Sequence, residues 1–214
     1  MDPIVLLTLI ISTALTFWGN LVKSTQQLIH LMSAHAAVIG LVKLTSCLVN
    51  LLVGLELEAL IDFFATFAEW FSAAAISPMI IYWGMKKTEN VSDEQLGGRR
   101  RAAAALVITS VLNVILFIIA SSYVPEHMSH FPFVALMFSF SILIMVMRRD
   151  PLKILIGLNM AENSLYPMFA ESPIVLIPFM LVLMVFVNMV GVFIIIEAYK
   201  DYRSMNVSDW RLAK

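Results

Sequence analysis

Cysteine, charge and recognisable catalytic motifs are what this sequence has least of. Cys47 is its one cysteine, so the chain offers neither an internal disulfide nor a cysteine metal site. It contains no HExxH, no CxxC and no glycine-rich phosphate loop. Its net charge of −1 gives no indication of nucleic-acid binding. We therefore expect no catalysis, cofactor or metal site in this chain alone.

The low charge also excludes a water-soluble domain. Only 14% of the residues are charged and 60% are hydrophobic, with a mean hydropathy of +0.89. The apolar residues form seven long blocks, and a membrane-spanning helix needs about 20 such residues. The sequence predicts an all-α, polytopic membrane protein of about seven transmembrane helices. The blocks are 3–22, 28–54, 60–84, 102–124, 132–147, 151–170 and 173–199.

The basic residues predict how the chain is oriented. Along seven spans, all Lys and Arg except Lys43 fall on one side of the membrane. The opposite connections, LELEALID, VPEHMSHFP and FAESP, contain none. Because positive charge concentrates on the cytoplasmic side, we expect the N-terminus outside and the C-terminus in the cytoplasm. The first block follows MDPIVLLTLI, which has no basic n-region, so we expect a retained helix.

Five segments are expected along the chain. Residues 1–85 would form a three-helix membrane part, and 86–101, KKTENVSDEQLGGRRR, a polar cytoplasmic loop. Residues 102–131 would hold a fourth helix and an outer loop. A second three-helix part would cover 132–200, followed by a cytoplasmic tail at 201–214.

The segment IGLNMAENSLYPMF, residues 156–169, places polar residues in the middle of an apolar block. Asn159, Glu162, Asn163 and Tyr166 are spaced i, i+3, i+4 and i+7, which puts them on one helix face. With Pro151 in the first turn, Glu162 lies roughly 17 Å deep. An intramembrane carboxylate costs about 2.5–3.5 kcal/mol and usually faces protein or a hydrated cavity. We predict a proton or ion path; the alternative is a hydrogen bond that only joins helices.

Charged residues also occur at mid-depth in the second and third blocks. Lys43 is too far from the inner membrane boundary to reach it comfortably, and Glu69 lies at a similar depth, so a Lys43–Glu69 pair is expected. Such a pair would serve transport or would be purely structural. His35 and His30 precede Lys43, and histidines of this kind shuttle protons or only hydrogen-bond neighbouring helices.

Further polar residues complete the candidate set. Asn188, in the last block, matches Glu162 in depth and would extend a polar layer or make one interhelical hydrogen bond. Asn50 lies nearly on the face of Lys43. Glu56, Glu58 and Asp62 are expected to contact water at the outer end, with a cation-attracting funnel as the weaker alternative.

Two stretches resemble a known family of membrane subunits. RRDPLKILIGLNMAENSLYPMF is similar to the second helix of the K subunit of respiratory complex I and of the C subunit of Mrp-type antiporters. EAYKDYRSMNVSDW resembles the C-terminal tail of that family. Those subunits have three helices, as in 132–199. The four-helix front and the glutamate of MAEN resemble component E of group 4 membrane-bound NiFe hydrogenases, of the hydrogenase-4 and formate-hydrogenlyase type.

The resemblance implies a non-catalytic subunit in the membrane arm of a hydrogenase in a prokaryotic cell membrane. Glu162, with Asn159, would then contribute to proton or sodium translocation. Iron–sulfur and NiFe centres would belong to partner subunits joined through the basic loops. Two departures stand out: Asn159 occupies the position of the complex I glutamate, and Val187 and Asn188 replace that family's second one. The alternatives are an independent ion-coupled transporter and a structural spacer.

Overall fold

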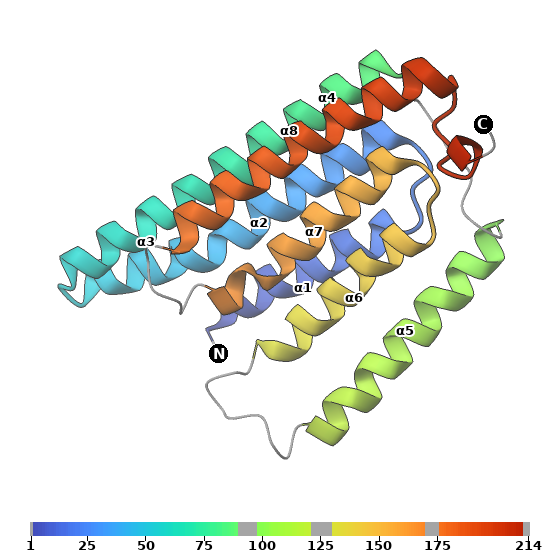
Figure 1. The fold of residues 1–214 in the computed structure, drawn as a ribbon. Coiled ribbons are helices and arrows are strands. Elements are labelled where there is room, and N and C mark those ends of the chain that lie inside the picture. Colours follow the sequence, from blue (N-terminus) through green and yellow to red (C-terminus); the bar gives the residue numbers. More distant parts are fainter. Residues whose placement is uncertain (1, 90–97, 121–129, 170–175, 212–214) are drawn as a thin grey trace.

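The computed structural model describes residues 2–89, 98–120, 130–169 and 176–211, and helices dominate throughout these ranges (Figure 1). Within these ranges, most of each apolar block falls on one helical rod. The elements are α1 (Pro3–Gly19), α2 (Thr25–Leu52), α3 (Glu56–Glu69), the π-helical η1 (Trp70–Ile76), α4 (Ser77–Lys87), α5 (Gly98–Ala120), α6 (Phe131–Val146), α7 (Pro151–Phe169), α8 (Leu176–Tyr202) and the short η3 (Asp209–Arg211).

Helix length and composition support a membrane protein. Within the described residues, four helical stretches are long and apolar enough to cross a bilayer: Thr25–Leu52, Glu56–Lys87, Arg100–Ile119 and Leu181–Tyr202. The second of these is α3, η1 and α4 joined end to end. Pro3–Gly19 and Phe131–Val146 are apolar but shorter. The predicted loop 86–101 is shorter than expected, because α4 continues through Lys87 and α5 begins at Gly98; residues 90–97 lie outside the described ranges.

The α3 helix is amphipathic in the reverse sense of a helix in water. Its buried face carries Asp62, Thr66 and Glu69, at most 6% exposed. Its outward face carries phenylalanines that are at least half exposed: Phe63, Phe64, Phe67 and, just beyond the helix, Phe71. A surface helix of a water-soluble protein buries its apolar stripe instead. Polar side chains facing protein and aromatic side chains facing outward are the arrangement expected in lipid.

The two predicted membrane parts share one core. α7 packs between α6 and α2, α8 runs along α4, and α1 contacts both α2 and α6 (Figure 1). Leu28 of α2, Ile81 of α4 and Ile144 of α6 belong to the same buried cluster as Ile156 of α7 and Val192 of α8. α5 lies apart, beside α6, and most of its side chains are exposed (Figure 1).

Trp70 fixes the approach of η1 to α2. Its indole Nε1 donates to the carbonyl oxygen of Ala37 at 2.9 Å. A Cβ on Gly40 would lie 2.5 Å from that nitrogen, so only glycine leaves room for the ring. Ser33 donates to the Ala74 carbonyl at 2.6 Å. This bond ties α2 to the π-helical segment a second time.

Basic residues gather at one end of the bundle. This end of the bundle, called the basic end below, carries the α1–α2 and α6–α7 connections and the C-terminal ends of α4 and α8 (Figure 1). Lys153 is fully buried there and donates to the Lys23 carbonyl at 2.7 Å, while buried Arg148 donates to the Val22 carbonyl. These two cations therefore hold the chain's own connections together. The basic loops are expected to present such cations to partner subunits, but Lys153 and Arg148 are buried. Arg149 is exposed.

Candidate functional site

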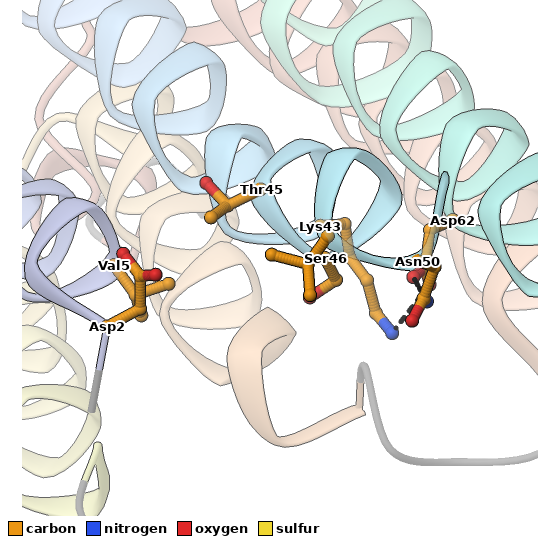
Figure 2. A pocket seen from close by; sticks show the side chains of 8 residues that line it. Asp2, Val5, Lys43, Thr45, Ser46, Asn50 and Asp62 are labelled. Atoms are coloured by element: carbon orange, nitrogen blue, oxygen red, sulfur yellow. Dashed lines mark hydrogen bonds and ion pairs between the residues drawn. The ribbon is translucent and has the colours of Figure 1, made fainter. Parts of the chain in front are cut away.

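Lys43 pairs with Asp62, and the expected Lys43–Glu69 pair is wrong. The Lys43 ammonium lies 3.0 Å from Asp62 Oδ1, and Asn50 Nδ2 donates to Asp62 Oδ2 at 3.0 Å (Figure 2). The two charged side chains are 14% and 8% exposed. Asp62 is therefore a largely buried ion-pair partner and not a freely exposed residue like its neighbours at the start of α3. Glu56 and Glu58 are exposed.

The depth of each residue along its helix does not decide whether Lys43 pairs with Asp62 or with Glu69. Lys43 lies nine residues before the end of α2, whereas Asp62 and Glu69 lie six and thirteen residues into α3. At 1.5 Å per residue these positions are about 13.5, 9 and 19.5 Å from the α2–α3 turn, so the lysine stands between the two acids. Asn50 orients the Asp62 carboxylate toward α2. Glu69 instead interacts electrostatically with Glu162.

The Lys43–Asp62 pair borders an open cavity at the end of the bundle opposite the basic end. The cavity has a volume of about 350 Å³. Its walls come from the start of α1, the C-terminal half of α2 and the first turns of α3 (Figure 2). The lining residues are Asp2, Val5, Lys43, Thr45, Ser46, Val49, Asn50 and Asp62.

A second polar group lies deeper, between α3 and α7. Glu69 is 1% exposed, and its Oε1 has no hydrogen-bond partner among the described residues. Glu162 is partly buried and interacts electrostatically with Glu69. The Tyr166 side chain is 5% exposed, interacts electrostatically with both Glu69 and Asp62, and its hydroxyl also lacks a partner in the described part of the chain. These contacts link α3 to the polar face of α7.

Asn159 and Asn188 are brought together across α7 and α8. The Nδ2–H group of each asparagine donates to the Oδ1 of the other, at 2.7 and 2.6 Å, and both side chains are buried. Asn159 also donates to the Leu155 carbonyl of its own helix. This pair is satisfied, as a structural clamp between helices would be. Asn163, one turn further along α7, is buried with its Nδ2 unpaired within the described ranges.

His35 lies on α2, two turns before Lys43, and is fully buried. Neither of its ring nitrogens finds a hydrogen-bond partner among the residues that the structure describes. His30 is exposed. The structure does not join His35 to the Lys43–Asp62 pair by any hydrogen bond within those residues, so these two candidates remain separate features of α2.

One member of the site, Asp62, is not among the residues that the sequence analysis expects in the path. Asp62, Thr66 and Glu69 have the i, i+4, i+7 spacing of one helix face. A search for polar residues on one face of the third apolar block therefore finds Asp62. Tyr166 lies on the polar face of α7 that its spacing from Asn159 and Glu162 predicts.

The side chains gathered at this site are ionisable and polar groups. Among the described residues, no group of three His, Cys, Asp or Glu side chains is arranged to hold a metal ion. Carboxyl groups, hydroxyls and an imidazole held in a low-dielectric interior accept and release protons or contact small cations. Comparison with protein-family models, with curated proteins and with solved structures gives no match to this chain.

Proposed function

We propose that this protein is a non-catalytic membrane subunit that contributes a path for protons or sodium ions. The observation that supports the proposal best is the pair Glu69 and Glu162. The carboxyl groups of Glu69 and Glu162 interact electrostatically inside a helical bundle, and the mid-depth cation Lys43 is engaged by Asp62. Intramembrane carboxylates are costly and mark ion and proton pathways by default.

The polar groups extend from one end of the bundle toward its middle. Asp62, Tyr166 and Glu69 form a sequence of electrostatic neighbours, and Glu162 follows Glu69. Asn163 follows Glu162 on α7, and its buried Nδ2 has no hydrogen-bond partner among the described residues. A transport path needs buried polar atoms that are free to bind a passing ion or proton. A network in which every polar atom already has a hydrogen-bond partner is held in one arrangement.

The topology that we propose has seven crossings, with the basic end in the cytoplasm. The helical rods number seven within the described ranges. The connections that carry Lys23 and Arg149 and the last turn of α8, which carries Lys200, lie at one end of the bundle. Cytoplasmic connections carry the excess of Lys and Arg. The cavity at Asp2, Lys43 and Asp62 would then open on the outer side.

The assembly that we propose is a complex I-like membrane-bound hydrogenase of group 4 in a prokaryotic cell membrane. Support comes from the resemblance of residues 148–214 to the K and C subunits named above and from the four additional helices in front of them. Large exposed apolar areas on α5 and α8 leave room for neighbouring membrane subunits as well as lipid. The NiFe and iron–sulfur centres would reside on peripheral partners.

A structural spacer is the rival that a specific observation favours. The reciprocal Asn159–Asn188 amides and the Lys43–Asp62–Asn50 group are satisfied contacts between helices. Such contacts hold helices together without moving any ion. Glu69, Tyr166 and Asn163 are not explained by this role, because one buried polar atom of each (Glu69 Oε1, the Tyr166 hydroxyl and Asn163 Nδ2) gains no partner from the described residues.

Two experiments on the native assembly test the proposal. Purification in mild detergent should yield a large-subunit hydrogenase and antiporter-like membrane subunits with this chain; purification of the chain alone would contradict the assembly. In the intact complex reconstituted in liposomes, Glu162→Gln should reduce ion movement at least several-fold while electron transfer continues. The matched control is Glu197→Gln, an exposed glutamate paired with Lys200 on α8. Unchanged ion movement in Glu162→Gln would favour the spacer.

A further inference from the structure

The open cavity between α1, α2 and α3 contains the chemistry of a cation site. Its ionisable lining residues are Asp2, Asp62 and Lys43, which together carry a formal charge of −1. The hydroxyls of Thr45 and Ser46, which also line the cavity, donate to carbonyls of their own helix. The exposed Glu56 and Glu58 add negative charge in the first turn of α3. This combination attracts small cations and repels anions.

A chain of contacts leads from this cavity inward. Asp62 forms part of the cavity wall and is itself 6% exposed. On its inner side, the Tyr166 side chain interacts electrostatically with Asp62 and with Glu69. Thr66 lies between the two acids on the same face of α3, is 1% exposed, and donates to the Asp62 carbonyl. The Tyr166 side chain is thus an electrostatic neighbour of both the cavity-lining Asp62 and the buried Glu69.

We propose that this cavity is the outer entrance of the ion path and admits small cations, with Asp62 and the Tyr166 hydroxyl leading to Glu69 and Glu162. The inference rests on the proposed function for the destination of the ion. It goes beyond that function by assigning a location, a side of the membrane and a charge class to the entrance. Lys43 sets the charge of the entrance, because its ammonium offsets one of the two carboxylates.

Cysteine labelling of the native complex in membranes tests the entrance. Cys47→Ser removes the one native thiol, and Ser46→Cys then places a single thiol on the cavity wall. The Ser46 hydroxyl bonds only its own helix, at 3.4 Å, so the replacement should be tolerated. The probes are membrane-impermeant methanethiosulfonates, one carrying a trimethylammonium group and one a sulfonate, added to sealed vesicles of either orientation. Ser12→Cys, at a fully buried position of α1, is the unreactive control.

We expect Ser46→Cys to react from the outer side, about tenfold faster or more with the cationic probe, and the attached group to slow ion movement several-fold while electron transfer continues. Failure to react, reaction only from the cytoplasmic side, equal rates with both probes, or labelling that leaves ion movement unchanged overturns the entrance. A separate result decides the proposed function. If Ser46→Cys is labelled from outside but Glu162→Gln leaves ion movement normal, the path through Glu162 fails, and the entrance to it fails with it.

Discussion

Asn159 and Asn188 exchange two hydrogen bonds across the α7–α8 interface, at 2.7 and 2.6 Å, although 29 residues separate them in the sequence. Both side chains are at most 2% exposed. Reciprocal amides of this kind satisfy a donor and an acceptor on each partner. The contact therefore fixes the register of α8 against α7 beside the proposed path.

Removing both members of this amide pair should cost less than the sum of the two single removals. Asn188→Leu leaves a buried Asn159 amide without its partner, which we expect to destabilise the protein by about 1–3 kcal/mol. The double variant with Asn159→Leu should be less destabilised than the sum of the single variants, with a coupling of about 0.6–1.7 kcal/mol. Unfolding in mixed detergent micelles measures all three. Strictly additive effects would show that the amides do not interact.

The Lys43–Asp62 pair predicts an asymmetric response to neutralisation. Lys43→Met leaves the Asp62 carboxylate buried with only the Asn50 amide, and we expect a loss of about 3–5 kcal/mol. Combining it with Asp62→Leu should restore much of the stability, because no uncompensated charge remains. The same unfolding titration, together with the yield of assembled complex, provides the measurement. A single variant as stable as the wild type would contradict the burial of this pair.

Gly40 should be intolerant of a methyl group, while Gly191 should accept one. Gly40→Ala places a carbon 2.5 Å from the Trp70 indole nitrogen and displaces the ring from the Ala37 carbonyl, at a cost of about 1–3 kcal/mol. Gly191→Ala meets Leu155 at an ordinary 3.4 Å and should gain up to about 1 kcal/mol of helix propensity. Thermal unfolding of the two variants side by side tests this. Equal effects would mean that Trp70 does not pack on Gly40.

The sequence predicted the helical rods well and the pairing of charges poorly. Apolar blocks locate helices because bilayer thickness demands their length, and the i, i+3, i+4, i+7 spacing placed Asn159, Glu162 and Tyr166 on one face of a helix. The choice of Asp62 over Glu69 by Lys43 depends on how α2, α3 and α7 pack, which depth along a helix does not specify. The burial of Lys153 and Arg148 is also a tertiary effect, because backbone carbonyls of the distant α1–α2 connection satisfy them.

Tyr166→Phe isolates the hydroxyl that we place between the cavity and the carboxyl pair. The ring remains to pack with Ala65 and Ala73 in the same buried cluster, so assembly and stability should change little. Ion movement by the reconstituted complex should fall several-fold at unchanged electron-transfer rate, because the polar connection to Asp62 is lost. Tyr82→Phe on α4, whose ring lies near the Lys86 ammonium, is the control. Normal ion movement in Tyr166→Phe would remove the hydroxyl from the path.

Glu69 provides the most direct test of the central claim that buried carboxyl groups carry ions through this subunit. Glu69→Gln preserves the size of a side chain that is 1% exposed and removes its ability to exchange a proton or balance a cation. The measurement is the number of ions moved per electron pair by the intact complex in sealed liposomes. We predict that this ratio falls at least several-fold while the complex assembles and transfers electrons. A ratio equal to that of the wild type would contradict the account.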